Sequence, residues 1–215
     1  MKTLFLSLFA VVANVMCHIN AAEMMDISSY PTLGDPKSPV QVVAFLEPKC
    51  PDSKKYNNES FPKLQSEFIN TNKISYSVIV TSFIPQSMPA AIALLCVYHQ
   101  DANKPNAILF FKYLNYIYQN QPSERDNWAT IEAMQKFAAK ASSDIDQNKL
   151  KACIEKGAFE AEIKKNTALG DKMMGHLSTP TIYVNGVKIE NSDDTINFDN
   201  LKNAIQKELD SKKSK

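Results

Sequence analysis

The stretch Cys50-Pro51-Asp52-Ser53 has residue types and a spacing that could carry thiol chemistry. A cysteine that lies between a buried strand and the first turn of a helix is close to backbone N–H groups that stabilise a thiolate. The thiolate is the nucleophile of thiol–disulfide exchange. Redox enzymes with this layout usually carry a second cysteine three residues later, where this chain has Ser53. The stretch therefore offers an attacking thiol without the thiol that would resolve a mixed disulfide.

The residues around Cys50 predict an accessible and reactive thiol. Pro51 suits the first helical position, where a missing N–H costs nothing. Asp52 opposes thiolate formation, whereas the nearby lysines favour it; these are Lys49, Lys54 and Lys55. A buried, inert cysteine is the alternative, because free cysteine is among the most buried residue types. The polar neighbours argue against burial, but they leave the balance between thiol and thiolate open.

The chain on both sides of this stretch has the pattern of a strand, a helix and a second strand. Residues 40–46 are nearly all apolar, which suits a fully buried strand of a parallel or mixed sheet. Residues 53–70 repeat apolar side chains at helical spacing, and Pro62 predicts a kink or a restart. Residues 74–80 form the next expected strand, which completes a βαβ unit.

The middle of the chain favours helices, and the last part returns to strands. Helices are expected over residues 89–100, 106–119, 128–141 and 147–174. Residues 181–184 and 187–190 flank Asn185-Gly186, a strong hairpin signal, and a final helix is expected over residues 197–209. This order predicts an α/β protein with a thioredoxin-like fold (βαβ then ββα) and an inserted helical subdomain.

The first residues predict a secretory signal peptide over residues 1–22. Lys2 provides a positive start, residues 4–12 form a short apolar run, and Ala21-Ala22 offers a cleavage site. An uncleaved anchor and a buried N-terminal helix are the alternatives, although the apolar run is too short for a comfortable membrane span. We therefore expect a periplasmic or secreted protein without stable membrane insertion after cleavage.

The rest of the chain is expected to form one globular unit in three stretches. Residues 23–86 and 177–215 are the two parts of the thioredoxin-like domain, and residues 87–176 are the helical insertion. The 215 residues, 44% of them hydrophobic, can bury one good core. The formal charge of +1 and the lack of a basic stripe give no case for nucleic acid as a partner. We expect no metal site and no cofactor, and the oligomeric state stays open.

Three cysteines remain beyond the expected signal peptide: Cys50, Cys96 and Cys153. An exported protein experiences an oxidising compartment, where cysteines are expected to pair. Three thiols allow one bridge and leave one thiol free. The residues alone do not say which thiol stays free.

Thr179-Pro180 is a second element of interest. A proline that opens a strand directly after a helical block is a candidate for a cis peptide bond, which would present the backbone of Thr179 to an extended peptide beside Cys50. An ordinary trans bond at the start of a strand is the alternative.

Four stretches together resemble the DsbA-like thioredoxin-fold disulfide oxidoreductases of bacterial envelopes. They are Leu33-Gly34-Asp35-Pro36-Lys37-Ser38-Pro39-Val40, Phe45-Leu46-Glu47-Pro48-Lys49-Cys50-Pro51, Ala93-Leu94-Leu95-Cys96 and Ser178-Thr179-Pro180-Thr181-Ile182-Tyr183-Val184-Asn185-Gly186. They follow one another in the family's order over residues 33–190, and they are specific only in combination.

The resemblance implies a role for six residues. Cys50 would be the nucleophile, and Thr179-Pro180 would form the cis-proline loop that faces it. Glu47 occupies a place that is often acidic in the family, where it would relay protons or tune Cys50; a purely structural carboxylate is the alternative. Cys96 and Cys153 lie where many relatives carry a cysteine pair, which implies a disulfide between them and a free Cys50.

The chain departs from the family at Ser53, where the resolving cysteine usually lies. Serine cannot resolve a mixed disulfide, although its hydroxyl could hydrogen-bond to the Cys50 thiolate. We therefore expect a monothiol thiol–disulfide oxidoreductase of the reductase or isomerase type. It would act on protein substrates with cysteines or disulfides, and glutathione or another small thiol would be the co-substrate that releases them. A chaperone or client-retention module without turnover is the alternative. A glutathione-transferase-like activity has no further support than Ser53 and the shared architecture.

Overall fold

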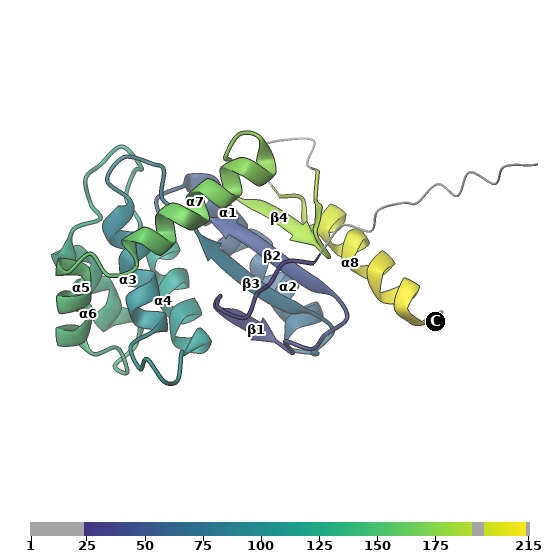
Figure 1. The fold of residues 1–215 in the computed structure, drawn as a ribbon, viewed down its shortest axis with the longest axis horizontal. Helices are drawn as coiled ribbons and strands as arrows, with labels where there is room; N and C mark the ends of the chain where they lie inside the picture. Colours follow the sequence, from purple (N-terminus) through teal and green to yellow (C-terminus); the bar gives the residue numbers. More distant parts are fainter. Residues whose placement is uncertain (1–23, 191–195, 214–215) are drawn as a thin grey trace, which may run out of the picture.

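The computed structural model describes residues 24–190 and 196–213. In this part of the chain, five strands form a mixed sheet with the order β1-β3-β2-β4-β5 (Figure 1). They are β1 (Thr32–Gly34), β2 (Gln41–Leu46), β3 (Ser75–Val80), β4 (Thr181–Val184) and β5 (Val187–Lys188). Only the central pair, β2 and β3, is parallel; the other neighbours are antiparallel. This is the predicted arrangement of a βαβ unit followed by a hairpin.

Strand β2 is buried on both faces, which explains its unbroken apolar sequence. Val42 and Ala44 belong to the main apolar core on one face, whereas Val43 and Phe45 belong to a smaller cluster on the other. The residues of helix α7 (Glu160–Met174) that cover this second face include Leu169 and Met173. Figure 1 shows α7 crossing in front of the sheet.

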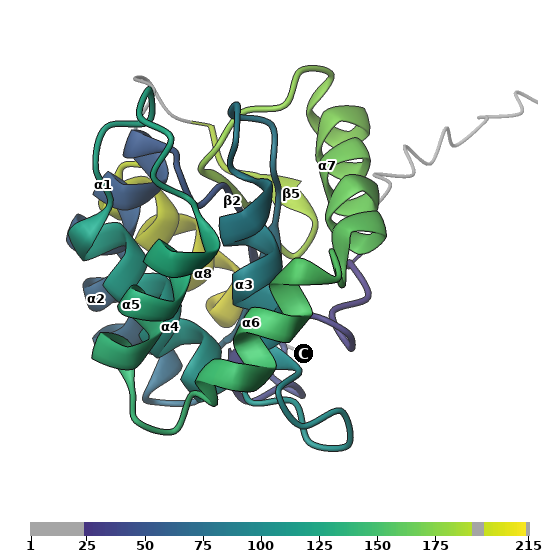
Figure 2. The same ribbon diagram turned by 90° about the vertical axis from the view of Figure 1, so that its left-hand side faces the viewer.

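Eight α-helices and a short π-helical turn surround the sheet in the described part of the chain. Besides α7, they are α1 (Pro51–Glu59), α2 (Phe61–Leu64), the π-helical turn (Gln65–Ile69), α3 (Met88–Tyr98), α4 (Ala107–Asn120), α5 (Ile131–Ala141), α6 (Gln147–Glu155) and α8 (Phe198–Lys213). The helix restarts at Phe61, one residue before Pro62. Figure 2 looks onto the group formed by α3, α4, α5 and α6.

The helix expected over residues 147–174 is in fact two helices. Helix α6 ends at Glu155, and the next residues include Gly157 and Phe159 with φ of +60° and +64°. A positive φ is incompatible with a continuing right-handed helix, and it is uncommon for a residue as bulky as phenylalanine. Phe159 is held there by stacking on the ring of His99, with 4.9 Å between the ring centroids.

Two other expectations also differ from the structure. The helix expected over residues 128–141 begins at Ile131, because Thr130 caps it by accepting a hydrogen bond from Ala133 N–H. Strand β1 was not expected; the sequence indicates only an extended segment there. The stretch is three residues long and only partly buried, so it lacks the pattern of a buried strand.

One apolar core extends from the sheet into the group of helices α3–α6. The division into residues 23–86, 87–176 and 177–215 therefore stays a prediction. The expected signal peptide, residues 1–22, lies outside the described residues. In the described part of the chain, no helix is both long and apolar enough to cross a membrane.

Candidate active site

Cys50 lies where strand β2 leads into helix α1. It is the N-cap residue of α1, with an extended backbone, and Pro51 occupies the first turn. Its sulfur accepts a hydrogen bond from the backbone N–H of Ser53 at 3.5 Å. The sulfur also lies 3.2 Å from the carbonyl oxygen of Thr179, to which the thiol donates. The strand-to-helix turn thus brings the cysteine, Ser53 and Thr179 together as the sequence predicts.

The expected exposure of Cys50 is wrong. Only 7% of the residue is exposed, and Lys49 beside it is 1% exposed. Two of the neighbouring lysines, Lys49 and Lys54, bind carbonyl groups of other loops with their ammonium groups. Lys49 Nζ donates to Pro85 O at 3.0 Å and to Asp126 O at 2.9 Å. The ammonium group of Lys49 is therefore used to join loops.

The side chain of Ser53 does not hydrogen-bond to the Cys50 sulfur among the described contacts. Its hydroxyl instead accepts a hydrogen bond from the backbone N–H of Glu47 at 3.5 Å, and the side chain is fully buried. The backbone N–H of Ser53 is the group that reaches the sulfur. Any residue other than proline would keep this contact, so the hydroxyl group is not needed for it.

Thr179-Pro180 lies directly before β4, and the peptide bond between the two residues is cis. Both residues are buried. Thr179 Oγ1 has no hydrogen-bond partner among the described residues, although its carbonyl faces Cys50. The two residues thus form the wall opposite the N-terminus of α1.

Glu47 is a fully buried carboxyl group three residues before Cys50, directly after β2. Its Oε2 accepts a hydrogen bond from the backbone N–H of Lys49 at 2.7 Å. Burial raises the pKa of Glu47 to about 7, although Ser87, the N–H groups of Lys49 and Cys50, and the charge of Lys49 all act to lower it. A group with this pKa can both take up and release a proton near neutral pH.

Comparison with known proteins adds to this geometry. The family model described as thioredoxin matches residues 28–207. Disulfide bond formation protein D of Bacillus subtilis (strain 168) is 33% identical over 187 residues, which cover 86% of this chain and 80% of the relative. The chain belongs to the DsbA-like thioredoxin family.

Solved structures of the DsbA-like family agree with this assignment. The crystal structure of Chlamydia trachomatis DsbA is similar with a TM-score of 0.77 and 34% identity, and the match covers 85% of this chain and 93% of that one. The oxidised form of Bacillus subtilis BdbD gives a TM-score of 0.77 and 30% identity, with 88% and 98% covered. The predicted family and fold are therefore confirmed. The coarse activity that these relatives support is thiol–disulfide oxidoreduction.

The structure places the other two cysteines of the described chain in a disulfide, as the family resemblance implied. Cys96 on α3 and Cys153 on α6 are bonded, with 6.0 Å between their Cα atoms. Cys50 is the free cysteine of the described residues. Within that part of the chain, no second thiol is therefore available to Cys50.

Sequence reasoning missed two residues that contact this site. Tyr118, on α4, donates a hydrogen bond to the carbonyl oxygen of Glu47 at 3.1 Å. Gln121, the residue after α4, donates through Nε2 to the carbonyl oxygens of Lys49 and Cys50. Gln121 begins the α4–α5 connection, residues 121–130. In the sequence it reads only as the end of a helix before a proline.

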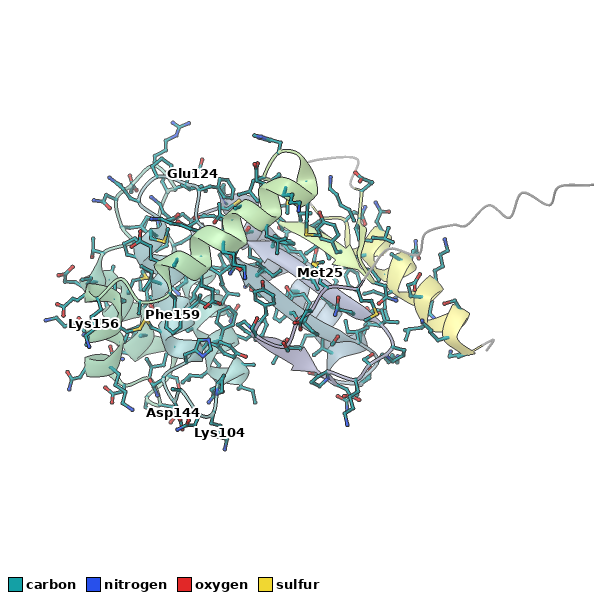
Figure 3. All side chains as sticks on the ribbon, in the orientation of Figure 1. Met25, Lys104, Glu124, Asp144, Lys156 and Phe159 are labelled. Carbon is teal, nitrogen blue, oxygen red and sulfur yellow. A yellow bond between two sulfur atoms is a disulfide. The ribbon has the colours of Figure 1, made fainter. Side chains whose placement is uncertain are left out.

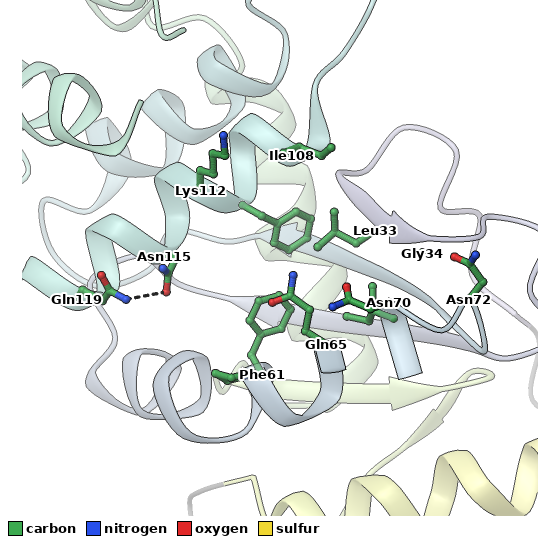
Figure 4. Close-up of a pocket in the computed structure, with 13 residues that line it drawn as sticks. Leu33, Gly34, Phe61, Gln65, Asn70, Asn72, Ile108, Lys112, Asn115 and Gln119 are labelled. Carbon is green, nitrogen blue, oxygen red and sulfur yellow. Dashed lines mark hydrogen bonds between the residues drawn. The ribbon is translucent and has the colours of Figure 1, made fainter. Parts of the chain in front are cut away.

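Of two hollows in this DsbA-like protein, one is separate from the Cys50 site and the other lies beside it. A hollow of about 660 Å³ between β1, α2 and α4 is lined by Gly34, Asn72, Lys112 and other residues (Figure 4), none of which contributes to the Cys50 site. A hollow of about 450 Å³ adjoins the cis-proline loop, since Leu177 lines it together with Phe83. Phe83 is 43% exposed, which leaves an apolar ring open beside this loop.

Glu47 leads to a pH-dependent prediction. Between pH 4.5, its usual pKa, and about 7, the folded protein keeps a proton that the unfolded chain has released. Raising the pH through this window therefore lowers the free energy of unfolding, by up to about 3 kcal/mol. The glutamine side chain of the Glu47→Gln variant does not ionise, so its free energy of unfolding lacks this pH dependence. We therefore expect the free energy of unfolding of the variant, minus that of the native protein, to increase by this amount between about pH 4 and pH 8.

Urea unfolding at both pH values measures this difference. The exposed Glu59 provides the matched control, since Glu59→Gln also removes one carboxyl group from the same part of the chain. A difference between Glu47→Gln and the native protein that does not change with pH would contradict the raised pKa.

Proposed function

We propose that the protein is an extracytoplasmic monothiol thiol–disulfide oxidoreductase that acts on protein substrates. One observation carries the proposal: Cys50 is a free thiol at the N-terminus of α1, with Ser53 in place of a second thiol and the other described cysteines bonded to each other. Cys17 belongs to the expected signal peptide, outside the described residues.

The proposed reaction has two exchange steps. The Cys50 thiolate attacks one sulfur of a client disulfide; an S–S bond to Cys50 forms, the client bond breaks, and the other client sulfur leaves as a thiolate that takes up a proton. A second thiolate, from the client or from a small thiol such as glutathione, then attacks the mixed disulfide and frees Cys50. Attack by a client thiol gives isomerisation, and two successive small thiols give net reduction.

The surroundings of Cys50 support exchange with proteins. The N–H of Ser53 stabilises a thiolate, and Glu47, with a pKa of about 7, can supply or accept the proton of a leaving thiol. The exposed ring of Phe83 and the adjoining hollow offer an apolar surface to a client chain close to Thr179.

An extracytoplasmic location has two lines of support. The sequence predicts an export signal over residues 1–22. The disulfide between Cys96 and Cys153 is of a kind that persists in oxidising compartments and is rare in the cytosol.

The proposal predicts that exchange depends on Cys50, and that net reduction also depends on an added thiol. We expect the protein to accelerate insulin reduction and the refolding of scrambled ribonuclease in glutathione, and Cys50→Ala to lower both rates to the uncatalysed background. Omitting glutathione should stop the net reduction of insulin by the native protein, because no small thiol is then oxidised in its place. Rates for the native protein no higher than those of Cys50→Ala would contradict the proposal.

The lack of a second free thiol among the described residues also fits a second candidate, a client-retention module that forms mixed disulfides without turnover. It predicts that scrambled ribonuclease is captured in adducts that disappear with reductant and with Cys50→Ala. Adducts that glutathione does not release within the time of the refolding assay would favour retention over exchange.

A further inference from the structure

The α4–α5 connection lies against the turn that carries Cys50, and hydrogen bonds run between them in both directions. Gln121 Nε2 donates to Lys49 O at 3.1 Å and to Cys50 O at 3.5 Å. In the other direction, Lys49 Nζ donates to Asp126 O at 2.9 Å, and Lys54 Nζ donates to Gln121 O at 3.3 Å. The side chain that binds directly to the backbone of the nucleophile is Gln121.

Gln121 is a buried residue in an exposed segment. Its exposed fraction is 6%, whereas residues 122–127 are all exposed. A buried amide is expected to satisfy its polar atoms by hydrogen bonds. The bonds of Nε2 go to the two carbonyl groups beside the candidate nucleophile, and Oε1 has no partner among the described residues. The hydrogen bonds of this buried amide therefore go to the backbone of Lys49 and Cys50.

A hydrogen bond to the Cys50 carbonyl affects the sulfur in two ways. It helps to fix the extended backbone of the N-cap residue (φ −68°, ψ 125°), in which the Ser53 N–H reaches the sulfur. It also places the positive end of the amide dipole on carbonyl oxygens that would otherwise add negative potential near a thiolate. Both effects favour the thiolate form of Cys50.

We propose that Gln121 is a positioning residue for the Cys50 nucleophile: it acts through the carbonyl groups of Lys49 and Cys50 and increases the fraction of reactive thiolate. This role rests on the proposed function, since it matters only where Cys50 attacks disulfides. Gln121 is a positioning residue because its contacts are with the backbone of the turn.

The chain offers a matched control for the test. Gln100 also holds a loop with its side chain, since Nε2 donates to Asp144 O at 2.9 Å and Oε1 accepts from Asp146 N–H at 2.6 Å. This loop lies at the opposite end of the group of helices from the α4–α5 connection; Figure 3 labels Asp144 in the first and Glu124 in the second. Gln121→Met and Gln100→Met each replace a loop-holding amide by an uncharged chain of similar length.

Alkylation of Cys50 by iodoacetamide across a pH series gives the readout, together with the thermal unfolding of each variant. We expect Gln121→Met to react about fivefold more slowly than the native protein well below the midpoint of the pH–rate profile, and to move that midpoint up by about 0.7 pH unit. Gln100→Met should keep the native profile, whatever stability it loses. The titratable groups around the sulfur, which are Glu47, Lys49, Asp52, Lys54 and Tyr118, are unchanged in both variants.

An alkylation profile of Gln121→Met equal to that of the native protein would overturn the proposal, as would a slower rate that Gln100→Met shares. If Gln121→Met does not fold, Gln121→Asn replaces it, because it keeps the amide but shortens its reach by one methylene; the same slower rate is expected. Alkylation needs no client. If Gln121→Met slows alkylation but the native protein shows no exchange with clients, only the proposed function is rejected. If the native protein exchanges with clients but Gln121→Met alkylates at the native rate, only the positioning role is rejected.

Discussion

Replacing Ser53 by cysteine is expected to convert a protein that needs an added thiol into one that frees itself from a mixed disulfide. Residues at the N-cap and three positions later in a helix have side chains within reach of each other. The Ser53 N–H already lies 3.5 Å from the Cys50 sulfur. A thiol held there has a far higher effective concentration than a millimolar thiol in solution, so release should be faster by on the order of a hundredfold or more.

The measurement uses the mixed disulfide between Cys50 and glutathione, prepared beforehand for the native protein and for Ser53→Cys. Mass spectrometry follows the loss of glutathione without any added thiol. The native adduct should persist, whereas Ser53→Cys should release glutathione and form a disulfide between positions 50 and 53.

Ser53→Ala is the matched control for this experiment. It removes the hydroxyl but keeps the backbone N–H that contacts the sulfur, so its adduct should be as persistent as the native one. Release by Ser53→Cys no faster than by Ser53→Ala would show that position 53 cannot resolve a disulfide on Cys50, and the monothiol interpretation of Ser53 would be wrong.

The members of the candidate site were predictable because they lie in short, local signals. Cys50 follows an apolar strand and precedes a helix, and Thr179-Pro180 precedes a strand, so the expected topology brings them together. The burial of Cys50 and the role of Gln121 were not predictable in this way. Gln121 is separated from Cys50 by 71 residues along the chain, and no periodicity or motif specifies a contact over that distance.

The fold shows the same division between local and long-range information. Asn185 and Gly186 both have positive φ, as the hairpin signal predicts, because these residue types tolerate that backbone. The break between α6 and α7 depends partly on Phe159, whose positive φ is supported by its contact with His99, the residue after α3. Gly157 was a local signal for this break, but the apolar pattern around it continues at helical spacing and concealed it.

Removing the disulfide is expected to cause the largest loss of stability of any change considered for this protein. The bridge joins residues 57 positions apart, and closing a loop of that length in the unfolded chain is worth about 4 kcal/mol in the chain-entropy model. We expect the double variant Cys96→Ala/Cys153→Ala to lose about this free energy of unfolding, which urea unfolding measures. Cys50→Ala removes a cysteine that closes no loop and serves as the control.

The same double variant also tests whether Cys50 depends on a resolving thiol elsewhere in the chain. Cys96 and Cys153 are the other cysteines of the described residues, and each is bonded to the other rather than to Cys50. If neither resolves the mixed disulfide, the variant should keep its rate of insulin reduction in glutathione at a temperature where it remains folded. Unchanged stability would contradict the contribution of the bridge. A loss of exchange in the folded variant would instead show that this pair takes part in the redox reaction, and Cys50 would then not act as a lone thiol.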